Sequence, residues 1–291
     1  MTSPLPVLAL LFNAFVWGLA WWPFRVMHGA GLHPLWATAV MYALVLAALL
    51  ALRPGLWAQV RAHPQLWLLA LSSGLNNVAF NWAVTVGDVV RVILLFYLMP
   101  AWAVLLAWKI LGERPTPQAI GRLALAFAGV ALVLWPEGAS AQRLLRDLSL
   151  ADGLALLGGF MFALTNVTLR RLHAVPGQAR MFAMFGGCML MALAAGAVGL
   201  RAGVVEPFPA PDAAWVVTAL LLAGVLMLGN WALQYGAARL AAGTTAVVML
   251  SEVVFASVSS VLLAAATPQP RTLLGGALIV LAALLASLRR R

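Results

Sequence analysis

Long apolar runs alternate with short polar interruptions along most of the chain. Each run approaches the length of about 20 residues that an α-helix needs to cross the hydrocarbon core of a bilayer. Charged residues, Pro and Gly separate one run from the next. The pattern predicts an all-α membrane protein with ten transmembrane helices, at residues 5–24, 35–52, 66–86, 92–111, 118–135, 151–169, 181–200, 213–235, 241–265 and 273–288.

The composition also indicates a membrane protein. Of the 291 residues, 64% are hydrophobic and 9% are charged, and the mean hydropathy is +0.99. A soluble domain carries about 25% charged residues. The net charge of +10 therefore reports on membrane topology rather than on nucleic-acid binding, because the basic residues do not lie in polar, aromatic-rich stretches.

Basic residues divide unevenly between the two sides of the predicted bundle. If the N-terminus is cytoplasmic, the cytoplasmic side holds Arg53, Arg61, Lys109, Arg114, Arg122, Arg170, Arg171, Arg180, Arg239, Arg289, Arg290 and Arg291. The opposite side then holds Arg25, Arg91, Arg143, Arg146, Arg201 and Arg271. Lys and Arg concentrate in cytoplasmic loops, so both termini are predicted to be cytoplasmic.

The second half of the chain repeats the first. The segment NWAVTVG at 81–87 returns as NWALQYG at 230–236, and FVWGLAWWPFRVMH at 15–28 aligns with FMFALTNVTLRRLH at 160–173. Each half holds five predicted helices, an odd number, so the second half must enter the membrane from the opposite side. The sequence therefore predicts two inverted five-helix repeats, residues 1–136 and 151–291, joined by a loop at 137–150.

Polar and aromatic residues recur at matching places in the two halves. Asn77, Asn81 and Thr85 are spaced four residues apart and share one helix face, as do Asn230 and Gln234. An amide in a membrane helix can also serve as a simple interhelical hydrogen bond, and a Trp as simple packing. We predict that the two halves enclose a substrate site with aromatic walls and a few amides, formed by Trp17, Trp21, Asn77, Phe80, Asn81, Trp82, Phe96, Met99, Phe162, Asn166, Asn230 and Gln234.

Glu252 lies within a predicted span and aligns with Met99 of the first half. An acidic residue at this depth costs about 3 kcal/mol to insert, so it normally faces a cavity or a partner. We predict that Glu252 is a coupling group or a polar contact, and three roles are open for its carboxyl. The carboxyl could accept a substrate ammonium, carry a proton that is coupled to transport, or form a structural hydrogen bond.

Several short motifs resemble the drug/metabolite transporter superfamily in its form with two EamA-type repeats. These are Trp17-Gly18, YLMPAW around Pro100, LGERPTPQAIG at 111–121 followed by AFAGVALVL, and LSEVVFA around Glu252. The chain departs from the family pattern in having Tyr42 where many relatives place an Arg, and in having no second LGE motif. The resemblance implies a carrier in the inner (plasma) membrane.

Within this superfamily, an aromatic wall without a fixed cation resembles exporters of aromatic and other neutral amino acids. An anionic substrate would require Lys or Arg in the cavity, and we expect none deep in a span. The prediction is therefore a secondary transporter that exports small amphipathic metabolites by alternating access. A carrier of another substrate class, a membrane-embedded enzyme and a channel are the alternatives.

Enzyme motifs do not occur in the sequence, which has no GxxxxGK[ST] loop, no HExxH and no CxxC pair. We therefore predict no enzymatic activity, no cofactor and no metal. The expected partners are a small-molecule substrate and the lipid bilayer, with no nucleic acid, and a monomer is one option for the assembly.

The LGER motif and two prolines allow predictions about local contacts and helix shape. Glu113 and Arg114 are interpreted as a local ion pair at the end of the fourth span, with a gating contact as the alternative. Pro23 and Pro100 are expected to bend or break the first and fourth spans.

Overall fold

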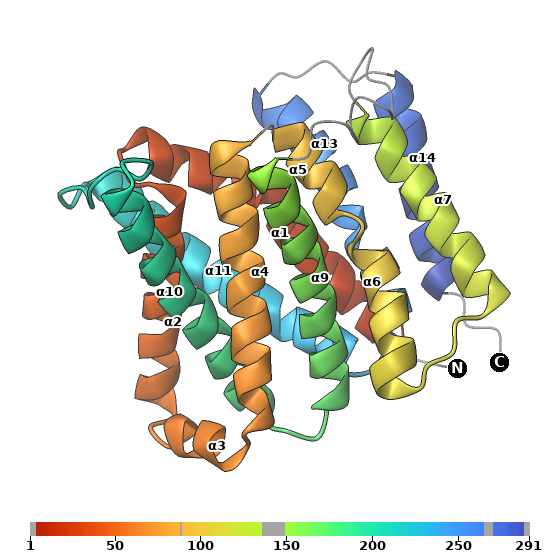
Figure 1. The fold of residues 1–291 in the computed structure, drawn as a ribbon, viewed down its shortest axis with the longest axis horizontal. Helices are drawn as coiled ribbons and strands as arrows, with labels where there is room; N and C mark the ends of the chain where they lie inside the picture. The colour runs from red at the N-terminus through yellow and green to blue at the C-terminus, as the bar shows by residue number, and fades with distance from the viewer. Residues whose placement is uncertain (1–3, 88, 136–148, 265–269, 288–291) are drawn as a thin grey trace.

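The computed structural model describes residues 4–87, 89–135, 149–264 and 270–287, and within these ranges every regular element is a helix (Figure 1). The helices are α1 (Leu5–Gly29), α2 (Pro34–Leu52), α3 (Leu56–Ala62), α4 (Gln65–Val86), α5 (Val89–Phe96), α6 (Met99–Leu106), the π-helix η1 (Ala107–Leu111), α7 (Pro117–Leu134), α9 (Leu150–Arg171), α10 (Gly177–Arg201), α11 (Ala213–Ala237), α12 (Ala242–Met249), α13 (Ser251–Ala264) and α14 (Pro270–Ser287).

In the described ranges, eight helices or joined helices are long and apolar enough to cross a membrane, so the chain is a multi-pass membrane protein. The other two predicted spans coincide with α4 and α14. The apolar part of α14, Pro270–Ala286, is shorter than the others. α4 carries Ser72, Ser73 and three Asn residues, which reduce its hydropathy. Within the described residues, length and hydropathy by themselves therefore identify eight of the ten predicted spans.

The two halves of the chain interleave rather than form separate bodies. The most extensive helix interfaces, α4 with α9 and α10, α1 with α11, α7 with α14 and α2 with α10, each join a helix from residues 5–134 to one from residues 150–287. Figure 1 shows α2 and α10 on one side of the bundle and α7 and α14 on the other. Any motion of one half against the other must therefore act at the helix interfaces between them.

Glycines allow two of these interfaces to be tight. A side-chain carbon at Gly187 of α10 would overlap the carbonyl oxygen of Ala70 in α4, and one at Gly74 would lie 2.6 Å from the Gly187 oxygen. Gly129 and Gly275 bring α7 and α14 together in the same way. These positions require glycine because backbone meets backbone, as at small-residue contacts in membrane helices generally.

The structure bears on three sequence-based predictions, which concern the region after α2, Pro23 and the connecting loop. The short helix α3 lies in a region interpreted as a loop. Pro23 lies inside α1, which continues past it to Gly29, so it does not break the helix. Most of the predicted connecting loop, 137–150, lies outside the described residues.

Candidate functional site

Two of the long apolar segments are interrupted at matching positions. α5 ends at Phe96 and α6 begins at Met99, and in the second half α12 ends at Met249 and α13 begins at Ser251. A shift of about 153 residues relates the two interruptions. Pro100 occupies the first turn of α6, where its missing N–H does no harm, while the second interruption has no proline. Helices broken in corresponding positions of two halves are a mark of substrate sites in secondary transporters.

Three of the predicted aromatic residues form a cluster at the first break. The ring of Phe96 lies 4.8 Å from that of Phe80 on α4 and 5.9 Å from that of Phe162 on α9. Gly158 and Gly159 of α9 make room for this cluster, since a side-chain carbon at Gly159 would lie 2.6 Å from the Phe96 oxygen. Rings at these separations are in favourable aromatic contact. The cluster thus places the end of α5 against both α4 and α9.

The predicted amide face of α4 is engaged with α2. Asn77 donates to the Tyr42 hydroxyl at 3.4 Å, and Asn81 donates to the Thr38 hydroxyl at 3.4 Å and to Asn77 Oδ1 at 2.9 Å. Both amides remain partly exposed. Tyr42, the position where relatives of this type often carry Arg, therefore serves as a neutral hydrogen-bond partner. The side chain of Thr85 lies outside the described part of the chain.

Asn166 of α9 differs from these amides because it is 1% exposed and neither its oxygen nor its nitrogen has a partner within the described part of the chain. It follows Phe162 by four residues and so shares the face that carries the aromatic cluster. Buried polar groups in proteins almost always have a hydrogen-bond partner. Asn166 is therefore the strongest candidate for a contact with a bound molecule.

Four further buried atoms on other helices also lack partners in the described residues. They are Asn13 Oδ1 on α1, Asn76 Oδ1 on α4, Trp102 Nε1 on α6 and Thr245 Oγ1 on α12. The Asn13 nitrogen donates to the Met249 sulfur at 3.5 Å. Asn13 lies one turn before Trp17 on α1. These unpartnered groups come from both halves of the chain and give the interior between them an unusual number of free donors and acceptors.

Glu252 lies in the first turn of α13, directly after the second break. The hydroxyl of Tyr97, which lies between α5 and α6, is next to its carboxyl. The two breaks therefore face each other through this pair of side chains. Met99, which aligns with Glu252, is 1% exposed and belongs to the main hydrophobic core.

The remaining predicted residues lie apart from the aromatic cluster. Trp21 donates to the Ser259 hydroxyl at 2.9 Å, and Trp17 packs against the main core. Trp82 lies against Gly199 of α10. Asn230 and Gln234 of α11 are joined to each other at 2.7 Å. With its amide in the alternative orientation, Gln234 would instead accept from Met181 N and donate to the Gly177 oxygen, so it is tied to the start of α10.

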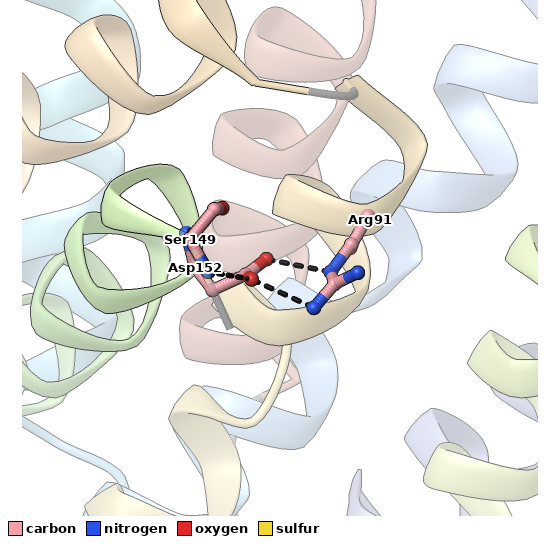
Figure 2. Close-up of polar contacts among 3 residues, drawn as sticks. All are labelled: Arg91, Ser149 and Asp152. Carbon is pink, nitrogen blue, oxygen red and sulfur yellow. Dashed lines mark hydrogen bonds and ion pairs between the residues drawn. The ribbon is translucent and has the colours of Figure 1, made fainter. Parts of the chain in front are cut away.

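One end of α9 is fastened to α5 by an ion pair. Arg91 donates to Asp152 through Nε and through a terminal nitrogen, each at 2.7 Å (Figure 2). Asp152 also accepts from the Ser149 backbone N–H at 2.7 Å and completes a capping box at the start of α9. From the sequence alone, Arg91 is used only to predict the topology, and this contact between the two residues is not predicted. Their positions at the starts of two spans on the same predicted side were the available signal.

The other end of α9 is fastened to the LGER motif. Gly112 has a φ of 71°, which ends η1 and turns the chain so that Glu113 points toward the second half. Glu113 accepts from Arg170 Nε at 3.4 Å and from the Ala242 backbone N–H at the start of α12 at 3.1 Å. The expected ion pair of Glu113 with Arg114 is wrong, because Glu113 contacts Arg170 and α12 instead. Arg114 lines a cavity of about 270 Å³ beside it.

Arg180 corrects another expectation. The sequence predicts a span that begins only at residue 181, but α10 begins at Gly177, so Arg180 lies in its first turn and is 6% exposed. Its side chain donates to the Leu169 oxygen at 3.3 Å. Because the predicted span begins one residue later, the sequence does not predict that Arg180 is part of a helix.

The interleaved halves, the membrane-length helices and the paired breaks are typical of helical secondary transporters. The chain belongs to the EamA-like transporter family, whose family model matches residues 4–135 and again residues 149–288. The predicted family relationship is thereby confirmed.

This chain resembles known proteins both in sequence and in fold. An uncharacterized transporter of Pseudomonas aeruginosa, PA0485, is 29% identical over 130 residues, which cover 42% of this chain and 44% of that protein. The alignment therefore spans less than half of either chain. A protein of known crystal structure shares the fold, with a TM-score of 0.77 and 19% identity, and the match covers 97% of both chains.

Proposed function

We propose that this protein exports small amphipathic metabolites, chiefly aromatic and other neutral amino acids, by alternating access. In this proposal ten spans form two inverted five-helix repeats, residues 1–136 and 151–291, in the inner (plasma) membrane with both termini in the cytoplasm. The halves rock about the space between the two helix breaks. The tight but interleaved interfaces between the halves are compatible with such a motion.

The observation that carries the proposal is the unpartnered amide of Asn166 beside the aromatic cluster. An amide offers two donor hydrogens and an acceptor oxygen, so it can bind both the ammonium and the carboxylate of an amino acid. The rings of Phe80, Phe96 and Phe162 offer apolar surface for a side chain. A few polar groups among aromatic walls are what small-molecule sites usually contain.

The other predicted residues take supporting roles in this proposal. Asn77 and Asn81 extend the polar surface along α4, while Trp17, Trp21 and Trp82 shape the walls. Asn230, Gln234 and Met99 hold the surrounding helices. Glu252, next to Tyr97 at the second break, is proposed as the group that takes up a proton during coupling.

A pair of neighbouring substitutions tests the role of Asn166. Asn166→Leu removes an amide that has no partner among the described residues, so we expect the folded yield to stay the same and transport to fall about tenfold or more. The control Thr165→Val removes a hydroxyl bonded to Ser72 Oγ at 3.0 Å and to the Met161 oxygen at 2.9 Å. That variant should lose stability while keeping the substrate affinity.

The measurement is uptake of a radiolabelled amino-acid panel into proteoliposomes, with and without a pH gradient. Saturable uptake of aromatic or neutral amino acids, lost in Asn166→Leu, would support the proposal. In Glu252→Gln the response to the pH gradient should disappear. Transport of a different metabolite with no amino-acid uptake would refute the substrate class, and unchanged uptake in Asn166→Leu would refute the site.

A further inference from the structure

A groove with two arginines lies at the end of the molecule where α1 and α10 begin and α11 ends. A groove of about 450 Å³ there is lined by Leu5 and Ala9 of α1, Gly177 and Arg180 of α10, and Trp231, Ala232, Gln234, Tyr235 and Arg239 of α11 and its end. It is separate from the aromatic cluster and from Asn166. None of the roles proposed above uses its two guanidinium groups.

Both guanidinium groups are held in place by the protein without a negative charge. Arg180 donates to the Leu169 oxygen. Arg239 donates to the Tyr235 oxygen at 3.0 Å and lies over the Tyr235 ring at 3.7 Å from its centre. The ion pairs between described residues are Arg91 with Asp152 and Glu113 with Arg170, so neither groove arginine has a carboxylate partner there. A buried charge without a partner is costly, which favours an anionic occupant.

The groove opens toward the lipid rather than toward the interior. Leu5, Leu8, Phe12 and Phe15 are all exposed and form one face of α1. Trp231 is also exposed and continues a row of exposed apolar side chains on α11, including Leu221 and Leu228. Apolar side chains on an outer helix face contact acyl chains. The arginines therefore lie where a row of lipid-facing apolar residues meets the end of the helices.

We infer that this groove binds the phosphate of an anionic phospholipid, with Arg180 and Arg239 on the headgroup and the apolar face of α1 and α11 along the acyl chains. Arginine recognises phosphate oxygens through its planar array of N–H donors. Basic pockets between helices near a membrane surface bind anionic headgroups in this way. The inference does not depend on the identity of the transported substrate.

The test measures thermal unfolding in nanodiscs of phosphatidylcholine alone and of phosphatidylcholine mixed with phosphatidylglycerol, together with the amount of phosphatidylglycerol that copurifies with the detergent-extracted protein. The wild type should be stabilised by phosphatidylglycerol. Arg180→Gln and Arg239→Gln should each reduce the bound lipid about tenfold and remove that stabilisation. Arg239 is exposed, so its variant carries the test if Arg180→Gln does not fold.

Arg61→Gln is the matched control, because Arg61 is an exposed basic residue on α3 at the same end of the molecule and outside the groove. It should keep the lipid response. If Arg61→Gln loses the response as fully as Arg239→Gln, the effect is diffuse electrostatics and the inference fails. If inorganic phosphate stabilises the wild type in phosphatidylcholine nanodiscs as much as phosphatidylglycerol does, the site takes a soluble anion and the lipid assignment fails.

Discussion

The two ends of α9 are each fastened to the segment that runs from α5 to Glu113, yet the two contacts differ in kind. At the first end, Asp152 is almost fully buried and receives two bonds of 2.7 Å from Arg91 and one from its own capping box. At the other end, Glu113 and Arg170 keep side-chain exposures of 27% and 29%, and their nitrogen and oxygen lie 3.4 Å apart. We call these the Asp152 end and the Arg170 end.

The difference bears on how a carrier of this construction could open. Short bidentate contacts to a buried carboxylate are strong and geometrically specific, whereas exposed, longer ion pairs contribute little. Under the proposed alternating access, the halves separate at one end while they stay closed at the other. The Arg170 end should therefore open at lower cost than the Asp152 end.

The largest expected effect comes from Asp152→Asn. This change removes the buried negative charge that receives both short bonds from Arg91, so we expect a loss of stability of about 3 kcal/mol. Thermal unfolding of the detergent-extracted protein measures it. The control is Asp212→Asn, since Asp212 caps α11 through the Ala214 N–H at 2.8 Å and belongs to neither ion pair described above. Equal losses in the two variants would reduce the role of Asp152 to capping.

A smaller effect is expected from Glu113→Gln. The amide can still accept from the Ala242 N–H, and the lost ion pair is long and only partly buried, so stability should fall by about 1 kcal/mol or less. Arg114→Gln should change stability still less, because Glu113 contacts Arg170 rather than its neighbour. The same unfolding assay compares the variants. A loss for Glu113→Gln as large as that for Asp152→Asn would abolish the proposed contrast between the ends.

The helices could be predicted from the sequence because the length of each apolar run and the polar residues at its ends can be read directly from the sequence. The breaks at residues 97–98 and at 250 were harder. Pro100 signalled the first, but the second involves Leu250 between two apolar helices, and no residue there favours a break by itself. Its position follows from the repeat, and in the structure α12 packs against α6 and α9 in addition to α1 and α14, which are the helices that α13 also contacts.

The candidate site was predicted in composition but not in detail. Spacing along one helix shows which side chains share a face, so Asn77 with Asn81 and Phe162 with Asn166 could be grouped. It does not show which amide finds a partner, and only the packed structure separates bonded Asn81 from unpartnered Asn166. The long-range pairs of Arg91 with Asp152 and Glu113 with Arg170 were missed for the same reason, since they depend on how α9 lies along α5 and α6.

The smallest expected effect concerns pH at the Asp152 end, where His33 precedes α2. Its Nδ1 accepts from the Leu35 N–H at 3.2 Å, so the ring must be unprotonated at that nitrogen to cap the helix. Burial lowers the pKa of His33, and the nearby His28 lowers it further, while Glu206 opposes the shift. The folded protein therefore favours the neutral ring, and this stabilisation is complete above the unfolded pKa of about 6.5 and is lost as the pH falls below it.

We expect the unfolding temperature of the wild type to fall between about pH 7.5 and about pH 5.5, above the range where carboxylates titrate. His33→Asn should flatten this fall, because Asn caps a helix without titrating. His63→Asn is the control, since His63 is exposed at the Arg170 end and should leave the slope unchanged. If the slope persists in His33→Asn, the pH response arises elsewhere and the Asp152 end holds no titrating cap. If it disappears, the two ends differ in pH response as well as in the strength of their ion pairs, and acidification would weaken the end that is otherwise the more firmly closed.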